Sequence, residues 1–276
     1  MGKIVWLASF PKSGNTWLRA FLHNLLADPK EAYDINALDT FCVSDSQAQW
    51  YQRLDPRPPT AMSLEEVAAL RPRVHRLFTE LGGPPIFVKT HMAMAELGGT
   101  PLISVDLSVA AIYIVRNPLD VVISHSHHYG ADIDTTIRLL ESDGTMTNAS
   151  LTHVAEYHGS WSEHVRSWTS QPSAGLHVVR YEDMLSAPLK TFTAIDRFLR
   201  LGSPRERVER AVRRSSFKVL QDQEKRRGFR EKTEVADRFF RAGKAGQWRT
   251  VLSRAQVDRI VAAHREQMAR FGYLPG

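Results

Sequence analysis

A short turn rich in small and polar residues lies between an apolar segment and an apolar helix pattern near the N-terminus. It reads Phe10-Pro11-Lys12-Ser13-Gly14-Asn15-Thr16-Trp17. Such a strand–turn–helix presents backbone N–H groups and a helix dipole to phosphate, while Gly14 permits close backbone approach and Ser13 and Thr16 offer hydroxyls. A nucleoside-triphosphatase loop would need glycine at Ser9 and lysine at Asn15, so the turn favours a diphosphate-like group over a magnesium triphosphate.

A histidine follows a second short apolar segment. His91 comes directly after Ile86–Thr90, at the carboxyl end of a predicted parallel strand, where α/β sheets bind their ligands. A near-neutral imidazole is suited to removing a proton from a hydroxyl. Lys89 lies two residues earlier, on the same face of the strand, and can reach the same group. Taken alone, a histidine at position 91 favours a structural or surface role.

An arginine ends a third apolar segment. Arg116 precedes Asn117 and Pro118, which predict the N-cap and first turn of a helix that contains Ser124. A guanidinium offers paired donors to a phosphate, which favours arginine over lysine at such a position. The alternative is a strand-end ion pair, for which Asp120 is the candidate partner.

Positive charge is concentrated in one part of the chain. The net charge is +6, yet residues 205–249 hold 15 Lys and Arg against 7 Asp and Glu, a local balance of +8. This segment suits an anionic ligand, and it is also compatible with a solvated helical face or with a non-catalytic module that binds nucleic acid or acidic polysaccharide. The single cysteine, Cys42, excludes an intramolecular disulfide and a metal site made of cysteines.

The elements that position these residues alternate along the chain. The predicted strands lack polar alternation, as parallel strands covered on both faces do, and are Ile4–Ser9, Ile86–Thr90, Ala110–Val115 and His177–Arg180. The predicted helices are Thr16–Ala27, Leu119–His128, one carrying Tyr157, Trp161, Val165 and Trp168 on one face, Leu189–Leu201 and Ala255–Phe271. We predict an α/β fold, a single domain over 1–276 with a P-loop-like central parallel sheet flanked by helices.

Two stretches are predicted as long loops, Tyr33–Pro59 and Asp132–Thr152. The first apolar segment is broken by Pro11 and Lys12, so we expect neither a signal peptide nor a membrane span, and we expect a cytoplasmic enzyme.

Collinear motifs resemble those of the cytosolic sulfotransferases, which use PAPS, 3′-phosphoadenosine 5′-phosphosulfate. Pro11–Trp17 resembles their 5′-phosphosulfate loop, with Asn15 where many members carry threonine. Val88–His91 is similar to the segment with the catalytic base, and Ile114–Ser124 to the segment that binds the 3′-phosphate.

Three later segments continue the resemblance. Val179–Met184 is similar to a strand end whose tyrosine reaches the adenine, and Ser215–Phe217 to a segment whose aromatic ring stacks on adenine opposite Trp17. Phe240–Arg249 resembles the R-K-G-x-x-G-x-W-K clamp of the 3′-phosphate, with Ala242 in place of a lysine. The dimer motif of many animal members is not matched, and the oligomeric state stays open.

The resemblance implies PAPS as co-substrate, PAP as product, no metal, and a hydroxyl of a small molecule (phenol, alcohol, sugar or natural product) as acceptor. It implies catalytic roles for His91 as base, Lys12 at the bridging oxygen, Ser124 as a link between Lys12 and the 3′-phosphate, and Lys89. The implied nucleotide-binding residues are Lys12, Ser13, Gly14, Asn15, Thr16, Trp17, Arg116, Ser124, Tyr181, Ser215, Phe217, Arg241 and Gly243. No nucleic-acid partner is expected; the alternatives are a P-loop-type nucleotide kinase and the polyanion-binding module.

Overall fold

The computed structural model describes residues 3–81, 83 and 85–276, which form two compact units. Unit 1 comprises Met1–Phe10, Cys42–Tyr113 and Leu139–Val178, and unit 2 comprises Pro11–Phe41, Ile114–Arg138 and Val179–Gly276. The predicted single domain over 1–276 stays a prediction.

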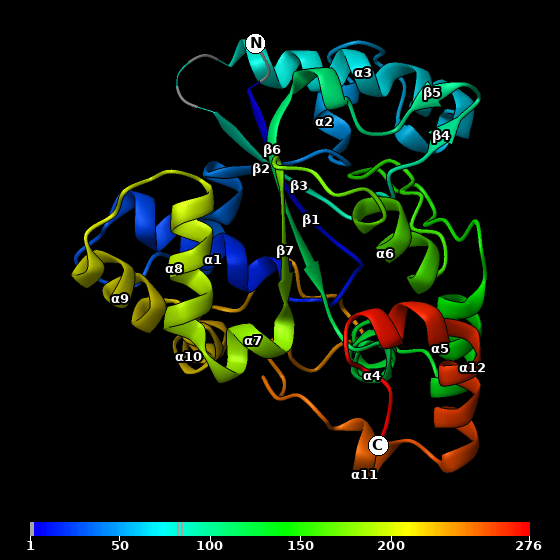
Figure 1. Ribbon diagram of the computed structural model, residues 1–276. Helices are drawn as coiled ribbons and strands as arrows, with labels where there is room; N and C mark the ends of the chain where they lie inside the picture. Colours follow the sequence, from blue (N-terminus) through cyan, green and yellow to red (C-terminus); the bar gives the residue numbers. More distant parts are fainter. Residues whose placement is uncertain (1–2, 82, 84) are drawn as a thin grey trace. The chain divides into compact units, whose positions relative to one another are not determined.

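A five-stranded sheet runs through the fold in the order β2-β3-β1-β6-β7 (Figure 1). The strands are β1 (Ile4–Ser9), β2 (Cys42–Ser44), β3 (Ile86–Thr90), β6 (Ser108–Val115) and β7 (Leu176–Arg180). β1 and β2 both pair with β3 in parallel, and Ala8 lies opposite Thr90. The prediction of an α/β fold with a central parallel sheet flanked by helices is confirmed, and the carboxyl ends of β1, β2 and β3 lie side by side.

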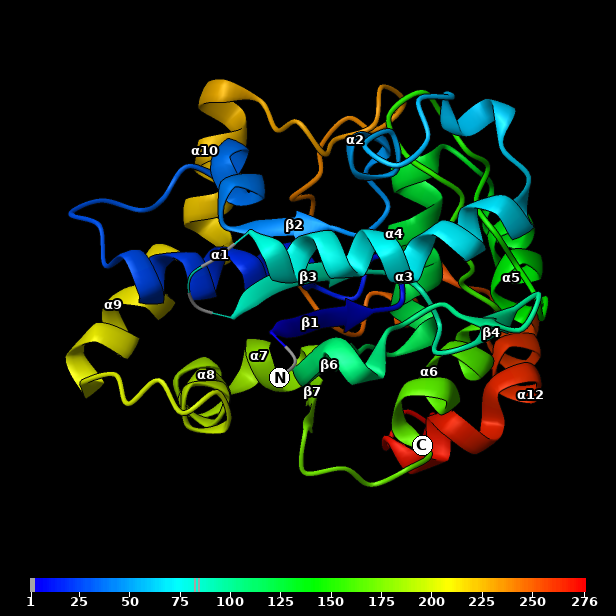
Figure 2. The same cartoon turned by 90° about the horizontal axis from the view of Figure 1, so that it is seen from above.

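In unit 1, helices pack on the strands through aromatic side chains. α3 (Leu64–Glu80) begins with a capping box formed by Ser63 and Glu66 and runs alongside β1 in Figure 2. There the Trp6 ring of β1 meets the His75 ring of α3 edge-on, with centroids 5.0 Å apart. α6 (Trp161–Thr169) packs on β6, where Tyr113 stacks on Trp168. These rings form the buried core of the unit.

Unit 1 also holds short elements. They are α2 (Ala48–Tyr51), η2 (Pro59–Ala61), η3 (Val105–Leu107) and a two-stranded antiparallel sheet of β4 (Glu96–Leu97) and β5 (Thr100–Pro101).

Unit 2 is mainly helical. Its elements are α1 (Asn15–Ala27), η1 (Ile35–Thr40), α4 (Pro118–Tyr129), α7 (Tyr181–Ser186), α8 (Pro188–Phe198), α9 (Arg205–Arg214), α10 (Phe217–Arg227), α11 (Trp248–Val251) and α12 (Arg254–Arg270). α1 packs against α9, and α9 against α8, as Figure 1 shows, while α11 and α12 pack against α4. Asn117 caps α4 by accepting from the N–H of Leu119, and Pro118 occupies the first turn, as the sequence predicts.

Several sequence predictions of local structure are wrong. Tyr33–Pro59 is not one loop, since η1, β2 and α2 lie within it, and Asp132–Thr152 contains α5 (Ile133–Glu141). Tyr157 precedes α6, because the capping box of Ser160 and Glu163 starts that helix at Trp161. No helix in the described part of the chain is long and apolar enough to cross a membrane.

Candidate active site

The turn after β1 has the conformation that a phosphate loop requires. Gly14 has φ +107 and ψ 14, and its carbonyl accepts the N–H groups of Trp17 at 3.0 Å and Leu18 at 3.2 Å as α1 begins. A Cβ at Gly14 would lie 2.7 Å from Cδ2 of Tyr181. Only glycine therefore allows the backbone to lie this close to the ring. The turn therefore leaves the N-terminus of α1 directed at the end of the loop.

The hydroxyl groups of the loop differ in their surroundings. Ser13 is 1% exposed, and its Oγ has no hydrogen-bond partner among the described residues. Thr16 Oγ1 instead accepts from Arg19, which forms a 2.7 Å ion pair with Glu231. A buried hydroxyl without a partner is costly, and it fits a loop whose remaining donors serve a ligand.

The ammonium of Lys12 lies over an aromatic ring. Its Nζ is 3.9 Å from the centroid of Phe239, and Lys12 has a positive φ of 65. Phe239 packs against a buried apolar cluster that Trp17 and Phe217 also border. The cation–π contact places a positive charge at the loop.

Arg116 is tied to the loop backbone. Its Nη1 donates to the carbonyl of Lys12 at 2.8 Å, and its guanidinium lies 4.3 Å from the ring centroid of Tyr181. Its Nε is buried and has no hydrogen-bond partner in the described part of the chain. The alternative partner, Asp120, is otherwise engaged: its carboxylate accepts from the backbone N–H groups of Gly246 at 2.6 Å and of Trp248 at 3.2 Å. Arg116 thus remains available for an anion.

The segment that contains Arg241 is brought to Arg116. Burial lowers the pKa of Arg241, and the positive charge of Arg116 lowers it further, as expected when two cations lie near one another. Arg241 donates to Gln247 Oε1 at 2.7 Å. An open cavity of about 550 Å³ is lined by residues 241–242, 244–247 and Thr250. Lys244 lines the same cavity as Arg241.

Aromatic side chains surround the predicted adenine position. Trp17 meets Tyr181 edge-on with centroids 6.0 Å apart, and Phe217 meets Phe240 edge-on at 6.1 Å. A Cβ at Gly243, which has φ +57, would overlap the Phe217 ring. In an edge-on contact one ring presents its edge, so its faces can still stack on a purine.

Two predicted serines differ in their engagement. Ser215 is fully buried, and its Oγ donates to the carbonyl of Ala211 at 2.8 Å within α9. Its hydroxyl is thus used within the helix, and a role toward a nucleotide stays a prediction. Ser124 lies in α4 and is partly buried.

His91 belongs to unit 1, directly after β3. Its Nδ1 donates to the carbonyl of Ser9 at 2.7 Å, which fixes the tautomer and leaves Nε2 with a lone pair. Its carbonyl accepts from His164 Nε2 at 3.0 Å, and His164 Nδ1 accepts from Tyr113. Burial and then the charge of Lys89 lower the pKa of His91 well below its usual value, so the ring is neutral and can accept a proton.

Acidic and basic groups that the sequence did not single out lie beside His91. Glu156 pairs with His158 at 3.6 Å, and the His91 and His158 rings lie perpendicular with centroids 6.3 Å apart. Burial alone would raise the pKa of Glu156, but the neighbouring His158 and the positive charge of Lys89 outweigh it and lower that pKa. Glu156 therefore carries a negative charge near the ring.

The sequence also did not single out Ser9 and Asp45, which lie beside the His91 segment in unit 1, or Glu231 and Phe239, which lie beside the loop in unit 2. Asp120 was considered only as a partner of Arg116. Within residues 3–81, 83 and 85–276, no three His, Cys, Asp or Glu side chains are grouped so that they could hold a metal ion.

The chain is similar in sequence and in fold to known sulfotransferases. The sulfotransferase domain model matches residues 3–272. The chain is 27% identical to Sulfotransferase 1A1 of Rattus norvegicus over 95% of this chain and 83% of the relative, and 26% identical to Sulfotransferase 1A1 of Canis lupus familiaris over 96% and 83%. Mouse sulfotransferase SULT7A1 complexed with PAP has a similar fold, with a TM-score of 0.64 at 21% identity over 96% of this chain and 84% of that one. Retinol dehydratase in complex with androsterone and PAP gives 0.63 at 19% over 96% and 80%.

Proposed function

Since the chain belongs to the sulfotransferase family, we propose that it moves the sulfuryl group of PAPS to a hydroxyl of a small-molecule acceptor, with His91 as general base. It is a PAPS-dependent sulfotransferase rather than a nucleotide kinase or a polyanion-binding module. The related structures that contain PAP agree with this donor, and retinol dehydratase has been crystallised with androsterone.

The observation that carries the proposal is the set of cations and unpartnered donors in unit 2. Arg116 and Arg241 lie near enough for their charges to interact, and Arg116 also holds the carbonyl of Lys12 in the loop. Ser13 Oγ and Arg116 Nε are buried donors without partners in the described residues. A nucleotide with phosphates at two positions would satisfy these groups, and Trp17 and Phe217 would stack on its base.

The proposed chemistry is an in-line displacement at sulfur. His91 Nε2 takes the proton of the acceptor hydroxyl while the acceptor oxygen forms its bond to sulfur and the bond from sulfur to the phosphate oxygen breaks. The electron pair of that bond stays on PAP, where Lys12, assisted through Ser124, stabilises the developing charge. Lys89, two residues before His91, is proposed to contact an oxygen of the moving group. The product is a sulfate ester of the acceptor.

Two variants test the assignment separately. His91→Ala should lower kcat by about 10²–10⁴-fold, the usual loss when a general base is removed, and should leave PAP affinity unchanged. Arg116→Ala should weaken PAP binding by about 10-fold or more, because a charge-assisted hydrogen bond is lost. Calorimetry with PAP and turnover of labelled PAPS with a panel of phenols, alcohols, sugars and natural products would measure both. Full turnover in His91→Ala would remove the base assignment, and a wild-type protein that ignores PAP would refute the donor.

The cytoplasmic location and the small size of the acceptor stay predictions. The panel addresses the acceptor directly, because its members differ in polarity and in the pKa of their hydroxyl groups.

A further inference from the structure

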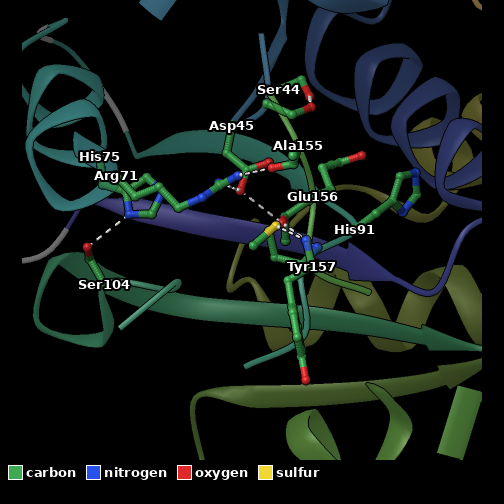
Figure 3. Close-up of polar contacts among 12 residues, drawn as sticks. Ser44, Asp45, Arg71, His75, His91, Ser104, Ala155, Glu156 and Tyr157 are labelled. Atoms are coloured by element: carbon green, nitrogen blue, oxygen red, sulfur yellow. Dashed lines mark hydrogen bonds and ion pairs between the residues drawn. The ribbon is translucent and has the colours of Figure 1, made fainter. Parts of the chain in front are cut away.

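A buried aspartate that no motif singled out lies beside the strand end that carries His91. Asp45 follows β2 and is 0% exposed (Figure 3). Its Oδ2 accepts from Thr90 Oγ1 at 3.0 Å and from Arg71 Nη1 at 3.2 Å, and its backbone N–H donates to the carbonyl of Lys89 at 3.2 Å. One residue therefore contacts both Lys89 and Thr90, the two residues that precede His91.

The hydrogen bonds continue past His91. Thr90 Oγ1 donates to Asp45 and accepts from the backbone N–H of Met92 at 3.0 Å. The hydroxyl of Thr90 thus spans His91, and the backbone on both sides of the histidine is connected to one carboxylate. The ring of His91 is held separately, by the carbonyl of Ser9 on β1. A shift of the strand end would lengthen that 2.7 Å bond and turn the ring.

The partner of Asp45 is also buried. Arg71, on α3, is 1% exposed and donates through Nη2 to the carbonyl of Ala155 at 3.0 Å. Figure 3 labels both residues. Ala155 precedes Glu156, so the guanidinium connects Asp45 to the second segment that lies beside His91. A buried ion pair is weak evidence of added stability, because its desolvation offsets the attraction. The role of this pair is to fix the positions of the two segments that lie beside His91.

We propose that Asp45 is a positioning residue for His91: through Thr90, Lys89 and Arg71 it fixes the strand end so that Nε2 of His91 is oriented toward the acceptor hydroxyl. The proposal rests on the proposed function, in which His91 is the base. A catalytic group displaced by about 1 Å commonly loses about 10²-fold in rate. Asp45 itself touches no reacting atom.

The test compares Asp45→Asn with Thr90→Val and with a matched control. Asp45→Asn removes the charge and weakens both side-chain bonds, whereas Thr90→Val keeps the ion pair and removes only the hydroxyl bridge. Asp55→Asn makes the same change in the exposed ion pair with Arg57. We expect kcat to fall by about 10–100-fold in Asp45→Asn and less in Thr90→Val. KM for PAPS and PAP affinity should stay at the wild-type value, and Asp55→Asn should be unchanged throughout.

A spectroscopic reading separates orientation from general damage. In protein labelled with nitrogen-15 histidine, the Nδ1 signal of His91 should move in Asp45→Asn and Thr90→Val, because its hydrogen bond to Ser9 changes. Should the uncompensated Arg71 prevent Asp45→Asn from folding, the neutral pair Asp45→Asn with Arg71→Gln replaces it, with the same expectations.

Two results would overturn the proposal. One is a folded variant with kcat within about twofold of wild type and an unmoved His91 signal; the other is a loss of PAP affinity that matches the loss of kcat. A wild-type protein that binds no PAP would contradict the proposed function instead, while the His91 signal would still report on Asp45.

Discussion

Replacing Gly14 by alanine should damage stability and nucleotide binding together. With φ +107, an alanine at this position is strained by about 1–3 kcal/mol. Its Cβ would also lie 2.7 Å from the Tyr181 ring, and that ring cannot move freely because it is 7% exposed and lies against Arg116. Overpacking of this kind costs a further ~1–3 kcal/mol. The expected loss in the free energy of unfolding is roughly 2–6 kcal/mol, a fall in Tm of about 4–10 °C.

Thermal unfolding with and without PAP measures both effects. Gly99→Ala is the matched control, since Gly99 has φ +75 and no atom within 4 Å of its Cβ position. It should lose only the strain, about 1–2 kcal/mol, and should be stabilised by PAP as wild type is. Gly14→Ala should be stabilised less, because relief of the overlap moves the loop. Equal losses in the two variants, with equal stabilisation by PAP, would refute this account of the loop.

The remaining predictions concern the clamp and the buried histidines. Asp120→Asn should weaken PAP binding by about 10-fold in calorimetry and lower the free energy of unfolding by about 1–3 kcal/mol, because the bonds that hold Gly246 and Trp248 lose their charge; unchanged affinity would show that these bonds do not position the segment for PAP. Lys244→Ala should weaken PAP binding by about 5–10-fold, and adding Ala242→Lys should restore it; a Lys244 variant with wild-type affinity would exclude this lysine from the clamp. Burial lowers the pKa of His75 and of His164 to about 3. Between that pH and about 6.5, these two histidines are protonated in the unfolded chain but neutral in the folded one. Stability in urea should therefore fall as the pH drops from about 6.5 toward 3, and a flat profile between pH 7 and 5 would contradict it.

The chemistry-bearing residues could be predicted because they sit where the local pattern changes. Arg116 and Tyr181 directly follow apolar runs, Gly14 lies in the turn after another, and parallel pairing makes the ends of such runs neighbours. In unit 2 the structure brings the three together, with Arg116 over Tyr181 and Tyr181 against Gly14. The strand predictions succeeded for the same reason, since buried parallel strands are continuously apolar.

The missed elements have weak local signals. β2 has three residues, too few to show a period, and Ser44 within it is polar. α3 was not predicted at all; it contains Pro72, a residue that usually ends a helix, although the capping box of Ser63 and Glu66 precedes it. In the folded protein, contacts of buried Val74 and Phe78 offset that cost. Tertiary packing stabilises these elements, and a short stretch of sequence carries no information about it.

Two aspartates whose contacts the sequence did not reveal play a similar structural role, one in each unit. In unit 1 the Asp45 side chain binds Thr90, and in unit 2 the Asp120 carboxylate binds the backbone of Gly246 and Trp248. Each aspartate is buried and contacts a segment far away in the sequence, so spacing cannot reveal its partner. A carboxylate accepts several hydrogen bonds and donates none. It can therefore hold a loop through the N–H and O–H groups of that loop. Asparagine at either place would fill the same volume yet weaken these bonds, which is why the same substitution is the informative one in both units.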